Sequence, residues 1–219
     1  MSGIIEATNL QTANIKHTNG TTAASVSSGG VVTFNNPPSG LNLPMELITS
    51  TTITSGSSNE LDFNGHFSST YTNYELHATN VHASEDGRHI GVRVLIGNAV
   101  KSDNYYRYTR IRMYSDSSTV SGFNESTDTE FGFFGGESIG LAAGSHTNFK
   151  LTIFDPLATD NFKIIKSEQS GIDLDSQGAA QQIHGSGHYT NGQAALSGIR
   201  LFINSGNIAS GKFKLYGIR

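Results

Sequence analysis

Apolar and polar residues alternate one by one in several short stretches of the chain, and no long stretch repeats its apolar residues with a helical period. Alternation of this kind over roughly four to eight residues is typical of a strand that buries one face. The sequence therefore predicts strands over 61–63, 74–78, 90–96, 149–153, 199–203 and 213–215.

Clusters of small, turn-forming residues separate these stretches. Glu85-Asp86-Gly87 and Asn191-Gly192 are examples, and Gly and Asn accept the positive φ angles that tight turns require. Many short strands joined in this way predict an all-β fold with two packed antiparallel sheets. This is a β-sandwich, for which a jelly roll is the preferred topology. About eight strands with a few long loops would account for the residues after the N-terminal segment.

Two polar stretches lack a clear alternation, and we expect both to be long loops. They are residues 115–129 and residues 167–191. Long polar loops often make contacts, so we expect at least one of them to meet a neighbouring copy or a partner. Whether either loop binds a ligand or an ion is left open.

The composition removes several classes of protein. The 219 residues include no cysteine, which excludes disulfide-stapled domains and thiolate zinc sites. The net charge is -4 and the 14 Lys and Arg are scattered, whereas a nucleic-acid binder usually carries a basic stripe. No apolar run is long enough to span a bilayer, and residues 1–6 do not resemble a signal peptide. We expect a soluble protein, made in a cytoplasm, with no nucleic-acid partner and no membrane insertion.

Residues 14–34 contain few bulky side chains but regular turn signals. Three thin apolar runs are separated by Asn19-Gly20 and Gly29-Gly30, which predicts three poor strands joined by tight turns. Such strands bury too little apolar surface to fold alone, so we expect copies of the chain to complete one another or to add to the edge of a partner's sheet. A disordered leader is the alternative. The residues expected to anchor the assembly are Ile15, His17, Asn19, Gly20, Val31, Val32 and Phe34.

Three of the four prolines fall within residues 35–44. Proline fixes φ and removes a hydrogen-bond donor, so this segment is expected to be an extended, fairly stiff connector. The chain is therefore divided into an N-terminal anchoring and trimerisation arm with its connector, residues 1–44, and a sandwich body, residues 45–219.

Three sequence patterns resemble structural proteins of marine and cyanobacterial tailed phages. The first is K-H-x-x-G-T-T-A followed by V-S-S-G-G-V-V, within Lys16 to Val32. The second is the ending S-G-x-x-x-L-Y-G-I, within Ile208 to Ile218, and the third is Y-x-x-Y-E-L with the strand that follows it, within Tyr71 to Gly97. Residues 115–190 carry no pattern that extends the resemblance.

The resemblance implies a non-enzymatic virion surface protein, expected as a homotrimer that docks through its N-terminal arm onto other virion proteins of the shell or tail. We rank a capsid decoration (cement) protein first, because the chain is short and has no repeated stalk. The alternative is a head fibre, a short tail fibre or a receptor-binding protein whose body binds a host surface glycan.

Candidate catalytic and metal-binding groups are weak, and we expect no enzymatic activity, no metal and no cofactor. His184 and His188 are separated by a glycine-containing segment, which suggests exposed loop histidines and not a zinc site. The acids Asp128, Glu130 and Glu137 are the residues to test for glycoside hydrolysis, which needs two carboxyl groups facing each other across a cleft.

One run of Tyr and Arg suggests an intersubunit contact. Alternation places five residues on one face, with Ile111 and Met113 on the other, and a face with both Tyr and Arg is more typical of an interface than of a core. Plain cross-strand pairing on a sheet is the other interpretation. The five candidate interface residues are Tyr106, Tyr108, Arg110, Arg112 and Tyr114.

Overall fold

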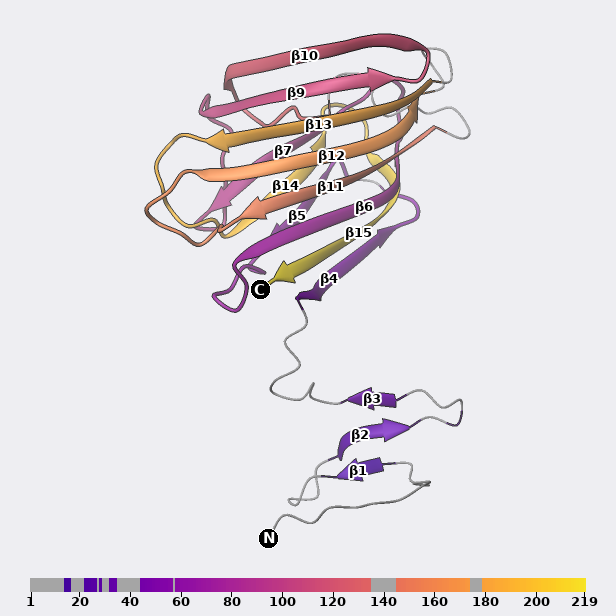
Figure 1. Cartoon of the computed structure of the whole chain (residues 1–219), viewed down its shortest axis with the longest axis vertical. Helices are drawn as coiled ribbons and strands as arrows, with labels where there is room; N and C mark the ends of the chain where they lie inside the picture. Colours follow the sequence, from indigo (N-terminus) through magenta and orange to yellow (C-terminus); the bar gives the residue numbers. More distant parts are fainter. Residues whose placement is uncertain are drawn as a thin grey trace. The chain divides into compact units, whose positions relative to one another are not determined.

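A computed structural model divides the chain into two compact units, Met1–Leu43 and Pro44–Arg219 (Figure 1). It describes residues 14–16, 22–26, 28, 32–34, 44–56, 58–134, 145–173 and 179–219. Among these residues, no helix has the length and hydropathy that would let it cross a membrane.

The N-terminal unit contains the three short strands that the turn signals predict. They are β1 (Asn14–Lys16), β2 (Thr22–Val26) and β3 (Val32–Phe34). They form one antiparallel sheet in the order β1-β2-β3, in which Ile15 and Phe34 both pair with Ala24 of the central strand. The Ala24 side chain is buried.

The C-terminal unit is an antiparallel β-sandwich, which confirms the predicted all-β class. Its larger sheet has eight strands in the order β10-β9-β13-β12-β11-β6-β15-β4, and its smaller sheet has four in the order β5-β14-β7-β8 (Figure 1). The strands are β4 (Met45–Ile53), β5 (Glu60–Asn64), β6 (Asn73–Ala83), β7 (Ile90–Ile96), β8 (Ala99–Val100), β9 (Tyr106–Tyr114), β10 (Ser117–Asp128), β11 (His146–Phe154), β12 (Lys163–Asp173), β13 (Ala179–Tyr189), β14 (Gly198–Ile203) and β15 (Ile208–Ile218).

The core lies between the two sheets and consists of the apolar positions of the alternating strands. In the larger sheet, Leu76 pairs with Leu151 on one side and with Leu215 on the other, and all three side chains are fully buried. The smaller sheet contributes Ile199 and Leu201 from β14, which are also buried. The period-2 pattern therefore identified the residues that fill the centre of the sandwich.

A cluster of aromatic rings fills the end of the core beneath β9 and β13. Residues 129–134 follow β10, and Phe131 forms a bridge to Val92 of the smaller sheet. The rings of Phe131 and Phe133 are stacked, with centroids 4.9 Å apart and planes inclined by 5°. Tyr106 lies edge-on to Phe131 at 4.8 Å, so this segment connects the two sheets where the smaller one is narrow.

Both predicted loops are largely strands, so those two predictions are wrong and the body has more strands than the eight expected. Residues 117–128 form β10, and the stretch 167–191 contains the end of β12 and all of β13, with 174–178 outside the described residues. Several inward positions of β12 and β13 are polar or glycine, among them Ser167, Gln169 and Gly185, which interrupts the alternation in the sequence. In β13 a Cβ at Gly187 would lie 2.6 Å from the Arg107 carbonyl oxygen, so the packing admits only glycine there.

Leu76→Ala is expected to lower the free energy of unfolding by about 2–5 kcal/mol, because it leaves a cavity between Leu151 and Leu215. Urea unfolding of the full chain measures the loss. Ser50→Ala, at an exposed position of β4, is the control and should change the free energy by less than about 0.5 kcal/mol. Equal effects of the two substitutions would contradict the assignment of Leu76 to the core.

Candidate functional site

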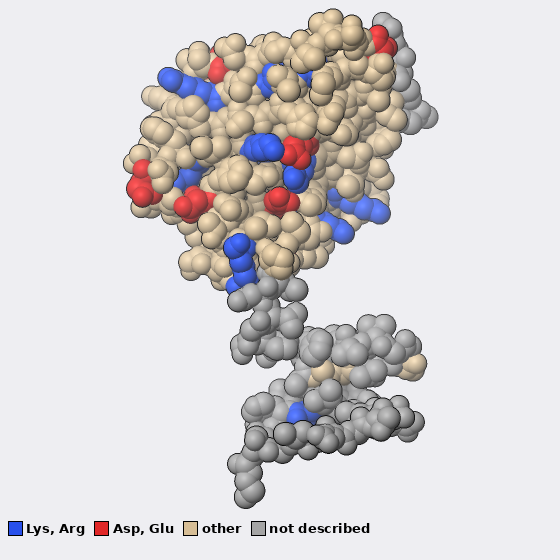
Figure 2. Space-filling model, viewed as in Figure 1, with Lys and Arg blue, Asp and Glu red and all other residues tan. Residues whose placement is uncertain are grey.

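The outer face of the eight-stranded sheet carries polar, charged and apolar side chains. Figure 2 shows this face in space-filling form, with few charged side chains and an acidic and basic group near its middle. One row of register partners runs across six strands through Lys214, His77, Lys150, Glu168, His184 and Ile111. The row gathers residues that are far apart in the sequence.

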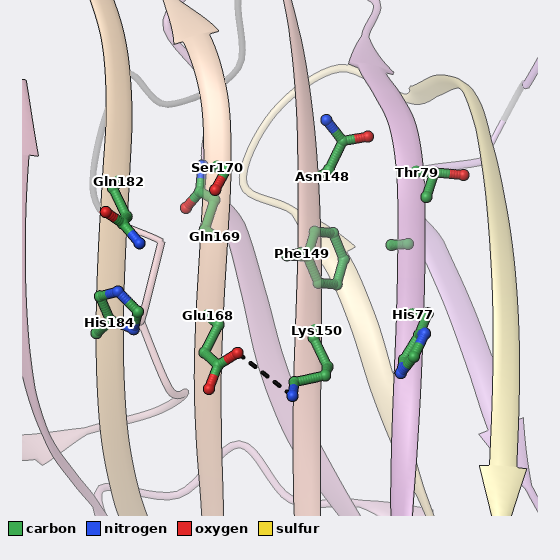
Figure 3. A pocket seen from close by; sticks show the side chains of 11 residues that line it. His77, Thr79, Asn148, Phe149, Lys150, Glu168, Gln169, Ser170, Gln182 and His184 are labelled. Atoms are coloured by element: carbon green, nitrogen blue, oxygen red, sulfur yellow. Dashed lines mark ion pairs between the residues drawn. The ribbon is translucent and has the colours of Figure 1, made fainter. Parts of the chain in front are cut away.

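A shallow hollow of about 370 Å³ lies over the middle of this face (Figure 3). Its side chains come from β6, β11, β12 and β13. Most of the labelled polar groups stand on the outer side of these strands, whereas Gln169 is buried on the inner side. The polar residues that line it are His77, Thr79, Asn148, Lys150, Glu168, Gln169, Ser170, Gln182 and His184. We call it the central hollow.

Ion pairs neutralise the charges of the central hollow. Glu168 accepts from Lys166 at 2.6 Å and lies 3.3 Å from the ammonium group of Lys150. Lys150 also lies 3.7 Å from Glu75, which contacts the His77 ring at 2.8 Å. The hydrogen bond from Lys166, together with Lys150, lowers the pKa of Glu168 despite partial burial. The Glu168 carboxylate is therefore ionised at neutral pH and paired with the ammonium groups of Lys150 and Lys166.

Two further hollows, of about 370 and 350 Å³, adjoin each other over the small outward side chains of Thr109 and Ser186. The first hollow is also lined by Ile164, His188 and Arg107. On the outer face, the second hollow is also lined by Ile111, Phe154, Lys166 and His184. We call the two together the Ser186 groove; it meets the central hollow at His184, which lines both.

An apolar group borders the Ser186 groove. Phe154 pairs with Ile164, and Ile164 pairs with His188, so these three side chains form one row on the outer face. Phe162 lies next to the row, with its ring centroid 6.2 Å from that of His188. The exposed fractions of Phe154, Phe162 and Ile164 are 40%, 47% and 47%, so a large part of each apolar side chain is open to solvent.

The Tyr/Arg run lies on one face of β9 as predicted, but that face is turned inward. Tyr106 and Tyr108 are buried at 0% and 8% exposure, and burial raises the pKa of both phenols. The interpretation of these two tyrosines as contact residues is wrong, because their rings pack in the core of their own chain. Ile111, expected on the core side, is 45% exposed on the outer face.

The remaining three candidate interface residues are half-buried where the larger sheet extends beyond the smaller one. Arg112 stacks over the ring of Tyr114 at 4.8 Å, and Arg110 stacks over Phe123 of β10 at 4.3 Å. Arg110 also donates to the carbonyl oxygen of Gly132, and burial lowers its pKa. An intersubunit role for Arg110, Arg112 and Tyr114 stays a prediction.

The two described acids of the hydrolase hypothesis are each engaged in separate contacts. Asp128 accepts a hydrogen bond from the Tyr108 hydroxyl at 3.1 Å. Glu130 lies 3.2 Å from the His89 ring and 3.5 Å from Arg93. Glu137 lies outside the described residues. Asp128 and Glu130 thus hold segments of the fold together.

His184 and His188 lie in strand β13 and not in a loop, so the loop interpretation is wrong. Four residues along a strand separate them by roughly 13 Å, too far to share one metal ion. Among the described residues, no group of three or more His, Asp or Glu side chains is arranged to hold a metal ion.

The predicted anchor residues all belong to the N-terminal unit. His17, Asn19, Gly20 and Val31 lie outside the described residues. Ile15, Val32 and Phe34 lie in β1 and β3, and their side chains are likewise outside the described part of the chain. Their anchoring role stays a prediction.

Comparison with known proteins gives no relative from which a function could be transferred: no protein-family model, no curated protein and no solved structure matches this chain.

Glu168→Gln should lower the free energy of unfolding by less than about 1 kcal/mol at pH 7, because its ion pairs are partly exposed. The pKa of Glu168 is lowered in the folded state, so its contribution is complete above the unfolded-state value near 4.3 and is lost as pH falls through the folded-state pKa. Urea unfolding at pH 7 and at about pH 3 tests this. A difference that persists at low pH would assign the effect to packing.

Proposed function

We propose that this chain is a non-enzymatic surface protein of a bacteriophage virion, which docks through its N-terminal unit and displays the β-sandwich. Capsid decoration ranks first, and the virion is the proposed location, with synthesis in the host cytoplasm. The motifs within Lys16 to Val32 and Ile208 to Ile218 support the phage assignment by resemblance.

The observation that carries the docking proposal is the unequal division of the chain. The sandwich, Pro44–Arg219, has its own core, whereas the N-terminal unit has strands of three, five and three residues. Sheets this small are marginally stable in water unless another surface covers them. Other virion proteins, or further copies of the chain, are the partners that would supply this surface.

We infer that the sandwich is a jelly roll. Within the larger sheet, four neighbouring strands have the order β4-β15-β6-β11, and the smaller sheet has the order β5-β14-β7-β8. The first and last strands of the body, β4 and β15, pair with each other. This is the nested arrangement of two Greek keys, extended here by β9, β10, β12 and β13. Jelly rolls are frequent in viral capsid proteins and lectins, which supports the proposal at the level of fold.

We assign self-association, expected as a homotrimer, to the edge strand β10. Residues 117–124 are all exposed and carry no charge, and among the described strands β10 pairs only with β9. Natural edge strands are usually protected by charges, proline or a covering segment. Val120 and Phe123 are 57% and 43% exposed on this edge, which favours coverage by another chain.

A short tail fibre or receptor-binding protein with a carbohydrate-binding body is the second candidate. It is favoured by the open, polar hollows on the outer face of the larger sheet, which could accept hydroxyl groups of a host surface glycan.

Removing residues 1–43 should give a body that unfolds cooperatively but no longer enters phage particles, because the docking unit is absent. Complementation with tagged full-length or shortened protein, followed by quantification in purified particles, measures incorporation. Normal incorporation of the shortened chain would overturn docking through the N-terminal unit.

The copy number of the full chain in particles separates the two virion roles. A ratio to the shell protein near unity supports decoration, and a few copies per particle support a fibre. Absence from the particle would overturn the virion assignment.

Val120→Lys should shift the purified chain toward monomer, because a desolvated ammonium group opposes strand pairing at β10. Light scattering after size exclusion measures the mass. Leu47→Lys on β4, the opposite edge of the sheet, is the matched control because Leu47 is 50% exposed. Dissociation by Leu47→Lys alone would place the contact at β4.

A further inference from the structure

We propose that the Ser186 groove binds an uncharged oligosaccharide, with Phe154 packing against the apolar face of a sugar ring and the groove floor bonding its hydroxyl groups. This deepens the second candidate function and rests on it, because it gives the carbohydrate-binding body a location and a ligand class.

The floor of the groove is made by small side chains. Thr109 and Ser186 are register partners on β9 and β13, and both are exposed on the outer face. The residues on either side of Ser186 are Gly185 and Gly187, whose missing side chains would point into the core. The hydroxyl groups of Thr109 and Ser186 can each donate and accept, as the hydroxyl groups of a sugar do.

One wall of the groove is apolar and the other is polar. A pyranose ring has the same two kinds of surface, an apolar face and a rim of hydroxyl groups. Phe154 and Ile164 form an apolar wall whose side chains are 40% and 47% exposed. Donors and acceptors stand beside it, since His184 and His188 flank Ser186 at two residues on either side along β13. Sites for polar small molecules usually combine an apolar surface with a few placed polar groups.

The charge of the groove favours an uncharged ligand over a phosphate or a nucleic acid. Arg107, Arg110 and Lys166 are the Lys and Arg residues that line the groove, and Glu125 is the acid that lines it. Arg110 donates to the carbonyl oxygen of Gly132, and Lys166 forms an ion pair with Glu168 at 2.6 Å. An anion-binding site would present an excess of cations, as phosphate recognition requires. With Arg110 and Lys166 engaged in these contacts, the groove offers one further cation, Arg107, and one acid, Glu125, which suits hydroxyl groups.

The groove also continues in the direction that a chain of sugars would need. It joins the central hollow at His184, and there Gln182, Ser170 and Asn148 provide amide and hydroxyl groups (Figure 3). Successive outward residues of a strand are about 7 Å apart, so several rows of polar side chains can contact successive sugar units.

The test uses the full chain on a glycan array, followed by calorimetry with an uncharged oligosaccharide that binds. Phe154→Ala should weaken binding about tenfold through the lost ring contact, and Ser186→Trp should abolish it by filling the groove. Leu47→Ala and Ser50→Trp, both on β4, are the matched controls. Leu47 is 50% exposed, neither residue lines the groove, and both substitutions should leave the affinity within about twofold.

Thermal unfolding of each variant verifies that it is folded, and a variant that fails to fold is replaced by Ile164→Ala, which should also weaken binding. Binding to no glycan, binding to anionic glycans alone, or equal affinities of Phe154→Ala and Leu47→Ala would overturn the proposal. Burial of Ser186 between copies of the chain, seen by cross-linking, would overturn it as well. Particle incorporation is measured separately, so failure of glycan binding leaves the docking result unaffected.

Discussion

The continuous hydrogen-bonded ladder of the eight-stranded sheet is the constraint on which the rest of the body depends. β15, the last strand, pairs with both β4 and β6, so the first and last strands of the sandwich are joined at the β4 edge of the sheet. Each added strand is held mainly through its backbone, which satisfies donors and acceptors that burial would otherwise leave unpaired. Segments with few apolar residues can therefore remain ordered.

The unequal width of the two sheets explains the uneven chemistry of the core. Where the four-stranded sheet covers the ladder, aliphatic residues such as Leu76 and Leu215 share the inward face with single aromatic residues such as Phe213. Toward β9 the covering is supplied by Phe131 and Phe133, whose rings require glycine on β13. Farther out, Arg110 stacks on Phe123 and stays half-buried, so the overhang is neither core nor ordinary surface.

The same arrangement separates the surfaces that the proposed functions would use. Docking is proposed for the N-terminal unit, self-association for the edge strand β10, and glycan binding for the outer face over β9, β13, β12 and β11. Among the described acids, Asp128 and Glu130 contact other side chains and hold segments of the fold together.

The sequence by itself determined the all-β class, the three thin N-terminal strands and the aliphatic centre of the sandwich, because period-2 alternation and turn residues are local signals. It could not reveal β10, β12 and β13 as strands. Inward positions of β12 and β13 hold polar residues or glycine, such as Gln169 and Gly187, and residues 117–124 of β10 are all exposed, so the role of these residues depends on neighbouring strands. It also placed the Tyr/Arg face correctly on one side of β9 but could not say which side meets the core. Only the tertiary structure decided that, and only it brought Phe154, Ser186 and Thr109 together, because register between distant strands is set by packing and not by local pattern.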